Sequence, residues 1–193
     1  MPTEHEYKYL LDMDIAGTLS RYPQSVIRQG YLSTSDSMDL RVRHSILKDG
    51  RDEWRLTFKQ KVVERKIEIE QVISSRDGMD LWEIAVSKLK KVRHYVENED
   101  RRDNTVWEID LFYNHNVGDL YFAMAELELP EGSPPPEELP DFLQKFLLFK
   151  VPLTDDRFLN KRLGDMGYAK NLYKEIRGTN YGHSHEEEKE ESI

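Results

Sequence analysis

The chain has 193 residues, 38% of them hydrophobic and 34% charged, with a formal net charge of −9 and no cysteine. This length predicts one domain with a sizeable core, and the lack of cysteine excludes disulfides, thiol catalysis and thiolate metal sites. No apolar run approaches the length of a membrane span, and the acidic balance argues against duplex nucleic acid, whose binding needs a basic face.

Short segments with alternating polar and apolar residues dominate the chain as far as residue 129. A period of two predicts β-strands, and turn-forming stretches such as KDGRDE and HNVGD separate several of the segments. We therefore expect a mainly β (α+β) protein with eight antiparallel strands. The predicted strands cover residues 3–12, 26–33, 39–47, 53–61, 64–74, 88–97, 104–113 and 120–129.

Helical patterns interrupt and follow these strands. The segment SRDGMDLWEIAVSKL, 75–89, has an apolar stripe at helical spacing, and Ser75 or Asp77 is the expected N-cap. After the proline-rich loop PEGSPPPEELP, the segment PDFLQKFLLF at 140–149 predicts a short helix. The segment 155–178 predicts one or two more, and these helices are expected to cover the sheet.

The C-terminal residues HSHEEEKEESI contain five glutamates and one lysine. Such a segment buries too little apolar surface to order itself. We therefore expect a folded domain over residues 1–178 and a disordered acidic tail over 179–193. No leader-like segment is visible at the N-terminus, which favours a cytoplasmic location.

Charged residues of one sign recur at spacing i, i+2 within the predicted strands. Because alternate residues of a strand share a face, each such pair lies in a row on one side of the sheet. The acidic rows contain Glu4, Glu6, Glu68, Glu70, Glu108, Asp110, Glu126 and Glu128. The basic rows contain Lys8, Arg41, Arg43, Lys59, Lys61, Lys66, Lys91 and Arg93.

These rows have two interpretations. An antiparallel sheet commonly exposes a polar face to solvent, and alternation alone is compatible with that. A solvated face, however, usually mixes signs, whereas like charges about 7 Å apart repel one another. Carboxylate pairs suit hard divalent cations, and arginine and lysine pairs suit phosphate oxygens. The segregated rows therefore favour a site for a metal–polyphosphate complex inside a barrel.

The same residues resemble the CYTH, or triphosphate tunnel metalloenzyme, superfamily. Its N-terminal E-x-E-x-K pattern is matched by Glu4, Glu6 and Lys8. The resemblance continues in order through QGYL, LRVR, LTFKQK, KIEIE, KVRHYV, WEIDLF and AELELP, and ends with DDRFLNKRL near residue 163. One departure is Lys66, where the family often has an arginine that can grip phosphate with two hydrogen bonds.

The resemblance implies an eight-stranded antiparallel closed β-barrel with flanking helices and Mg²⁺- or Mn²⁺-dependent hydrolysis of triphosphates. We expect inorganic tripolyphosphate as the substrate; thiamine triphosphatase, class IV adenylate cyclase and a non-catalytic polyphosphate- or nucleotide-binding module are the alternatives. The expected metal ligands are Glu4, Glu6, Glu108, Asp110, Glu126 and Glu128. The expected catalytic residues are Lys8, Glu68, Glu70 and Asp110. The expected phosphate ligands are Lys8, Arg41, Arg43, Lys59, Lys61, Lys66, Lys91 and Arg93.

Two aromatic residues bear on the choice of substrate. Trp54 stands near the place where thiamine triphosphatases stack a tryptophan on thiamine, but it alternates with Arg55 and shares a face with Leu56 and Phe58. This parity favours packing against a helix over ligand stacking. Tyr31 either orients the attacking side of the tunnel or packs in the core.

Overall fold

Nine antiparallel strands form one sheet in the computed structural model of the chain. The structure describes residues 4–35, 38–47, 49–62, 65–97, 105–114, 116–130, 132–137 and 139–190, without the side chains of 4, 34, 61, 65, 66 and 179–190. The strands are β1 (Glu4–Leu11), β2 (Gln24–Thr34), β3 (Met38–Ile46), β4 (Asp52–Val62), β5 (Arg65–Ile73), β6 (Ser87–Glu97), β7 (Val106–Tyr113), β8 (Leu120–Pro130) and β9 (Leu147–Val151).

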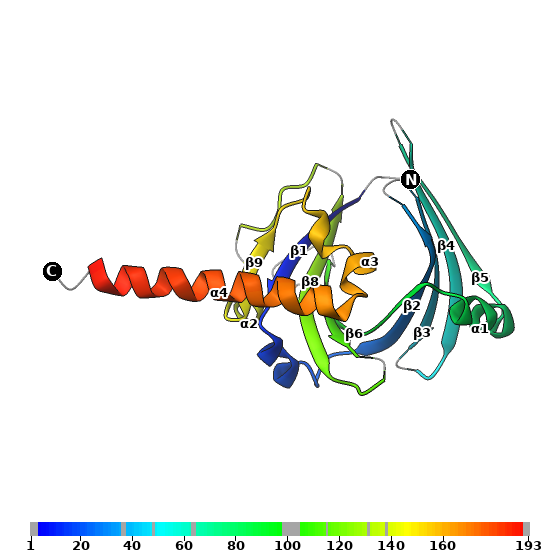
Figure 1. Ribbon diagram of the computed structural model, residues 1–193, viewed down its shortest axis with the longest axis horizontal. Helices are drawn as coiled ribbons and strands as arrows, with labels where there is room; N and C mark the ends of the chain where they lie inside the picture. Colours follow the sequence, from blue (N-terminus) through cyan, green and yellow to red (C-terminus); the bar gives the residue numbers. More distant parts are fainter. Residues whose placement is uncertain are drawn as a thin grey trace.

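The sheet is strongly curved and has two wings (Figure 1). Its strand order is β5-β4-β3-β2-β6-β7-β8-β1-β9. We call β2, β3, β4 and β5 the β2–β5 wing, and β6, β7, β8 and β1 the β6–β1 wing. Strands β2 and β6 pair side by side and join the two wings.

The predicted closed eight-stranded barrel is wrong in two respects. The sheet has nine strands, and in the described part of the chain its terminal strands, β5 and β9, pair only with β4 and β1. Alternation of polar and apolar residues fixes the two faces of each strand, but it does not determine whether the last strand pairs with the first. The mainly β fold with few helices is confirmed.

The ninth strand arises where the sequence predicted a helix over 140–149. Only the first part of that segment is helical, as α2 (Asp141–Gln144), and the chain then extends into β9. The apolar run is short, and a short apolar run fits a buried strand as well as a helix. Pairing with β1, in register from Lys8 opposite Val151, decides between them.

The remaining helices are mostly short. They are η1 (Met13–Thr18), α1 (Ser75–Glu83), η2 (Asp156–Phe158), α3 (Asn160–Leu163) and α4 (Met166–Glu190). The N-cap of α1 is Ser74, whose hydroxyl accepts a hydrogen bond from the backbone of Asp77, so the two predicted caps are wrong by one residue or more.

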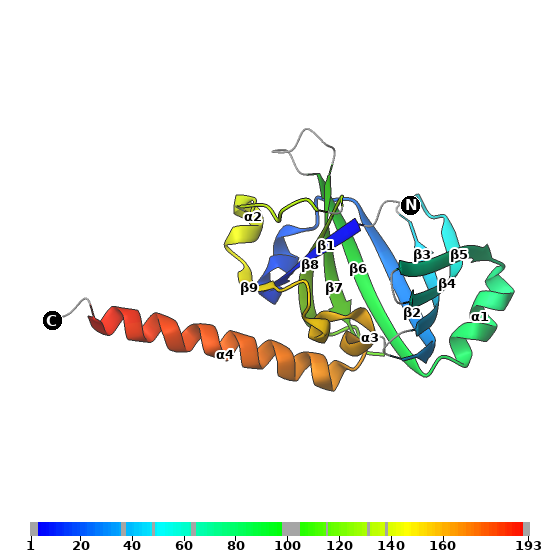
Figure 2. The ribbon, with the colours of Figure 1, turned by 90° about the horizontal axis from the view of Figure 1, so that it is seen from above.

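Helix α4 crosses the β6–β1 wing and continues beyond the body of the protein (Figure 2). It is helical to Glu190, so its backbone extends through much of the stretch 179–193 that we predicted to be a disordered tail. The division of the chain at residue 178 stays a prediction. Within the described residues, no helix combines the length and apolar character needed to cross a membrane.

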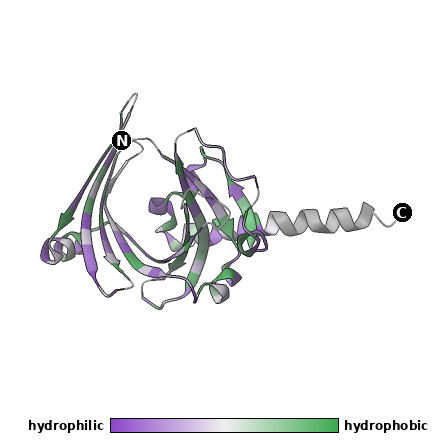
Figure 3. Cartoon of the chain, turned by 180° about the vertical axis from the view of Figure 1, so that it is seen from behind, coloured by the Kyte–Doolittle hydropathy of each residue, from purple (hydrophilic) through white to green (hydrophobic). Residues whose placement is uncertain are grey.

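The convex face of the sheet carries an apolar core. Residues of one parity, such as Tyr9, Trp107, Ile109 and Leu127, pack there against η1 and α2 and are nearly inaccessible to solvent. Full burial of an aliphatic side chain of this size stabilises the fold by about 1.5–3 kcal/mol. Hydrophilic and hydrophobic residues alternate along the strands in Figure 3, as expected for two faces of different character.

The concave face carries the opposite parity and is divided along its length. At one end, apolar residues such as Leu10, Phe112 and Met124 pack against Phe158 and the first turns of α4. The charged rows continue from these same strands toward the other end. The fold therefore places the predicted rows on one concave face that helices cover at one end only.

Candidate functional site

Arg93 is the centre of an ion-pair network on the β6–β1 wing. Its Nε donates to Asp110 Oδ1 at 2.7 Å, and its Nη2 donates to Asp110 Oδ2 at 2.7 Å and to Glu126 Oε2 at 2.6 Å. Its Nη1 donates to Glu108. A guanidinium presents five N–H donors in a planar fork, which is why one arginine can hold three carboxylates at once.

Lys91 and Asp110 form the most deeply buried ion pair of this network. Their side chains are 1% and 0% exposed, and Lys91 Nζ donates to Asp110 Oδ2. Since Arg93 also donates to both carboxylate oxygens of Asp110, this group is enclosed by cations. Asp110 was predicted to be a metal ligand and a catalytic residue; in this arrangement it fixes the positions of Lys91 and Arg93.

Lys8 extends the network to the exposed edge of the wing. Its ammonium lies 2.9 Å from Glu6 Oε2 and 3.3 Å from Glu126 Oε1. The Glu6 side chain is 39% exposed, whereas Glu126 is 1% exposed. The predicted grouping of Glu6 and Lys8 on one face is therefore confirmed, and Glu126 lies directly across from Lys8 in the register of β1 and β8.

The network shifts the ionisation of its members. Burial alone would raise the pKa of Glu126, but Lys91, Lys8 and Arg93 hold it below its usual value. Burial would lower the pKa of Lys8, but Glu126 and Glu6 raise it. Burial raises the pKa of Glu108, and the nearby Asp110 and Glu126 add to this despite Arg93. Glu108 is therefore the carboxylate whose charge the network compensates least.

A second set of ion pairs lies on the β2–β5 wing. Arg55 contacts Glu53 at 2.5 Å and Glu70 at 3.2 Å, and the Thr57 hydroxyl donates to Glu70 at 2.8 Å. Lys59 lies 2.6 Å from Glu68 across the β4–β5 pair. These side chains are 25–40% exposed, apart from Thr57, which is buried. This wing is therefore more hydrated than its neighbour.

Arg41 and Arg43 stand on β3 between the two sets. Arg41 Nη2 lies 3.9 Å from Glu70 Oε1, and Arg41 Nε is buried without a hydrogen-bond partner among the described residues. Arg43 donates from Nε to the side-chain oxygen of Gln29 at 3.3 Å. Both guanidiniums are thus on the concave face with donors that no described carboxylate saturates.

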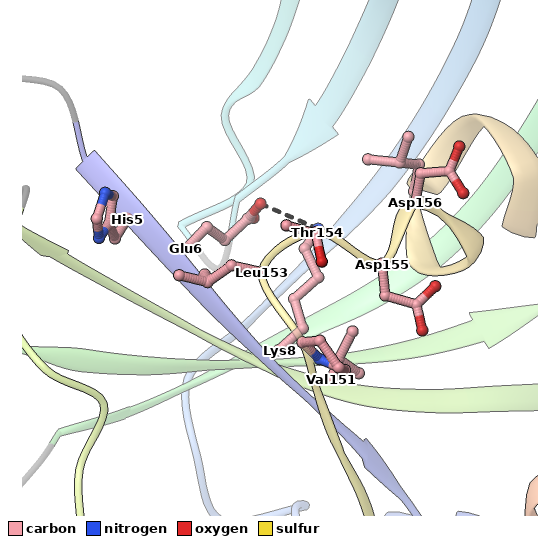
Figure 4. A pocket seen from close by; sticks show the side chains of 10 residues that line it. His5, Glu6, Lys8, Val151, Leu153, Thr154, Asp155 and Asp156 are labelled. Atoms are coloured by element: carbon pink, nitrogen blue, oxygen red, sulfur yellow. Dashed lines mark ion pairs between the residues drawn. The ribbon is translucent and has the colours of Figure 1, made fainter.

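A cavity of about 410 Å³ opens beside Lys8. Figure 4 shows Glu6 and Lys8 projecting from β1 beside the loop that carries Leu153, Thr154 and Asp155. Polar groups from two elements therefore meet at the exposed end of the network. The sequence pointed to this loop only from Asp155, where the motif DDRFLNKRL begins; residues 152–154 have neither strand nor helix periodicity.

Several predicted site residues lie outside the described side chains: Glu4, Lys61 and Lys66. Glu128 is exposed, and Glu68 faces Lys59 on the far wing. The residues that the structure brings together are Lys8, Lys91, Arg93, Glu6, Glu108, Asp110 and Glu126.

The donor set fits a hard divalent cation in its chemistry. Glu6, Glu108 and Glu126 offer carboxylate oxygens on one face, which Mg²⁺ and Mn²⁺ prefer. Glu108 is 26% exposed and Glu6 is 39% exposed, so both are accessible. In the described residues, however, no three acidic or histidine side chains are already grouped closely enough to hold a metal ion. These carboxylates form ion pairs with Lys8 and Arg93 instead.

Trp54 lies on the convex face, as its parity predicted. It is 7% exposed, stacks on His44 with ring centroids 4.3 Å apart, and lies directly beneath Gly78 of α1. A Cβ atom at residue 78 would stand 2.3 Å from the indole, so the contact depends on glycine. Trp54 therefore packs against a helix and does not face the charged rows.

Gln29 is a buried polar residue of the concave face that sequence reasoning missed. Its side chain is 0% exposed, and it bonds both Tyr31 and Arg43. The signal was present: Gln29 stands between Ile27 and Tyr31 in a period of two, where an apolar residue would be expected. An amide in an otherwise apolar row needs hydrogen-bond partners inside the protein.

Comparison with known proteins adds no identification. No family model matches the chain, and no curated protein matches it. The resemblance to the triphosphate tunnel superfamily, which rests on short motifs in order, therefore stays a prediction.

Proposed function

We propose that the chain is a divalent-metal-dependent hydrolase of linear triphosphates, with inorganic tripolyphosphate as its substrate. The observation that supports this most directly is the convergence of two kinds of group on one concave face. Cations that phosphate oxygens prefer lie beside accessible carboxylates that Mg²⁺ or Mn²⁺ prefers. These groups are Lys8, Arg41, Arg43, Arg93, Glu6, Glu108 and Glu126.

The cations of this face would supply most of what phosphoryl transfer requires. Its transition state spreads negative charge over the phosphate oxygens, and fixed positive groups stabilise that charge. Arg41 and Arg43 have donors left for substrate, and Lys8 lies at the cavity. Their role is to bind and orient the phosphate chain in line with the attacking water.

The metal would be held by Glu6 and Glu108, with Glu126 behind them. Bound there, Mg²⁺ or Mn²⁺ would polarise phosphate oxygens and lower the pKa of a bound water. The carboxylates would have to exchange part of their contact with Lys8 and Arg93 for the metal. The displaced cations then face the substrate, so metal and triphosphate are expected to bind together.

The position of Trp54 favours tripolyphosphate over thiamine triphosphate. On the convex face under α1, its indole lies away from the charged rows. Thiamine triphosphatase and class IV adenylate cyclase activities remain outcomes that a substrate panel would reveal.

A second candidate is a polyphosphate-binding module without hydrolysis. It is favoured by the ion pairs that occupy Glu6, Glu108 and Glu126, and by the lack of a ready metal cluster in the described residues. Such a module would bind triphosphate through its cations alone.

The decisive measurement is phosphate release with Mg²⁺ or Mn²⁺ over a panel of tripolyphosphate, pyrophosphate, ATP and thiamine triphosphate, with cyclic AMP assayed in parallel. Arg41→Ala and Arg43→Ala should each weaken binding of tripolyphosphate and slow its hydrolysis. Arg51→Ala is the matched control, because Arg51 lies in a turn and is 77% exposed. Binding without release would favour the binding module. Equal effects of all three variants would favour a solvated face.

A further inference from the structure

On the β2–β5 wing, a buried side-chain amide on β2 bonds an arginine on β3 that has no close carboxylate partner among the described residues. Gln29 on β2 stands directly opposite Arg43 on β3 in the strand register. Its side chain is 0% exposed and makes two hydrogen bonds, to Arg43 Nε at 3.3 Å and to the Tyr31 hydroxyl at 2.6 Å. Nothing in the charged rows predicts an uncharged residue at this place.

Chemistry alone fixes the direction of these bonds. A guanidinium has only donors, so the amide group that faces Arg43 must be the carbonyl oxygen. The amide nitrogen therefore faces Tyr31 and donates to its oxygen. Burial, outweighing the nearby Arg41, raises the pKa of Tyr31 to about 12, so Tyr31 is a neutral phenol at physiological pH. The Gln29 amide that accepts from Arg43 Nε is thus uncharged, and so is the Tyr31 phenol that this amide bonds in turn.

Arg43 differs in this respect from the other arginines of the concave face. Arg93 donates to three carboxylates and Arg55 to two. For Arg43, no carboxylate oxygen of the described residues lies within ion-pair distance. Burial, Arg41 and Arg93 lower its pKa, and the more distant Glu70 offsets this only in part. A cation held away from water beside two other cations is costly unless an anion joins it.

We propose that Gln29 is a positioning residue that holds Arg43 through Nε and keeps it without an internal counter-ion, so that its two terminal amino groups receive a phosphate of the substrate. The identity of that anion as a triphosphate rests on the proposed function. A glutamate at this position would supply a carboxylate and satisfy Arg43 from within the protein. The neutral amide orients the guanidinium without neutralising it.

The test compares Gln29→Glu with Gln29→Met. The first variant keeps the shape of the side chain and adds a counter-ion, and the second keeps its length and removes both hydrogen bonds. Affinity for tripolyphosphate is measured by calorimetry with Ca²⁺, a metal expected to bind without rapid hydrolysis. Gln29→Glu should weaken binding at least about tenfold, which corresponds to about 1.4 kcal/mol. Gln29→Met should weaken it less, because Arg43 keeps its charge and loses only its orientation.

A double-mutant cycle separates positioning from a merely structural role. In an Arg43→Ala background, Gln29→Glu should have no further effect on affinity, because Gln29 acts through Arg43. Melting of the ligand-free variants is measured in parallel. If Gln29→Glu does not fold, Gln29→Met and its cycle with Arg43→Ala carry the same test. KM for tripolyphosphate in the Mg²⁺-supported reaction should rise by the same factor as the dissociation constant.

The outcomes for this proposal and for the proposed function are distinct. Unchanged affinity in both Gln29 variants, or additive losses in the cycle, would overturn the positioning role while hydrolysis by the wild type still stands. Weaker binding in Gln29→Glu, without any hydrolysis by the wild type, would support the positioning role and reject the hydrolase. A wild-type protein that binds neither tripolyphosphate nor pyrophosphate would overturn both.

Discussion

The two wings of the sheet carry the same i, i+2 pattern of charged residues, but they use it differently. On the β6–β1 wing, Lys91 and Asp110 are almost inaccessible to solvent, and Arg93 holds three carboxylates. On the β2–β5 wing, the Arg55 and Glu70 side chains are 36% and 30% exposed, and Arg43 bonds a neutral amide. The buried centre of one wing, around Asp110, is a closed network that maintains its own geometry, while Glu6 and Glu108 at its edge stay accessible. The other has cationic donors to offer a ligand.

The largest expected effect is on stability, from Arg93→Met. Removing the guanidinium leaves buried Asp110 and Glu126 with less compensation, and breaking a buried ion pair costs about 3–5 kcal/mol. Arg55→Met is the matched control on the other wing. Its more exposed pairs should contribute less than about 1 kcal/mol. Urea unfolding measures both, and equal losses would contradict the distinction between the wings.

The next effect is on turnover, from Glu6→Gln. The amide keeps the size of the side chain but removes an anionic oxygen that the metal would need, so hydrolysis of tripolyphosphate should fall at least about 100-fold, or about 2.7 kcal/mol of barrier. Stability should change little, because Glu6 is 39% exposed at the edge of the network. Phosphate release at the wild-type rate from the folded variant would reject the metal assignment.

The sequence predicted the faces of this molecule better than its contacts. The eight predicted strands correspond to β1–β8 within a few residues, because turn residues bound a clear period of two. The same period predicted correctly that Trp54 and Arg55 lie on opposite faces of β4. It could not show that β5 and β9 stay apart, because closure depends on curvature summed over the whole sheet.

The sequence also could not predict which residues each charged side chain contacts. Asp110 belongs to an acidic row by sequence, yet Lys91 and Arg93 surround it, since the neighbouring strands β6 and β7 bring these side chains to one point. Register between strands is a tertiary property, and a one-residue slip would exchange the faces. Gln29 is different, because a polar side chain between Ile27 and Tyr31 is a signal that the sequence itself contains.

A smaller effect separates the convex face from both wings. Gly78→Ala places a methyl group 2.3 Å from the Trp54 ring, and such overpacking costs about 1–3 kcal/mol. Gly17→Ala is the control, since nothing lies within 4 Å of the added atom. The melting temperature should fall for Gly78→Ala and not for Gly17→Ala. Turnover per folded molecule, and the ratio of thiamine triphosphate to tripolyphosphate hydrolysis, should stay constant in both variants. A change in that ratio would indicate that Trp54 contributes to substrate binding.

The smallest effect concerns acid, and it tests how hydrated the β2–β5 wing is. Burial would raise the pKa of Glu70, but the Thr57 hydroxyl and Arg55 hold it below its ordinary value of 4.5. A folded-state pKa below the unfolded one stabilises the protein above the unfolded value, and this stability is lost as pH falls through the folded pKa. Glu70→Gln should therefore lower the free energy of unfolding at about pH 6 by less than about 1 kcal/mol, and its curve should approach that of the wild type as pH falls through the folded-state pKa of Glu70. The exposed Glu83 on α1 provides the control, Glu83→Gln. Because Glu70 remains partly exposed, solvent screens its ion pairs. A fall of several kcal/mol in the free energy of unfolding would mean that the β2–β5 wing is as inaccessible to solvent as the β6–β1 wing.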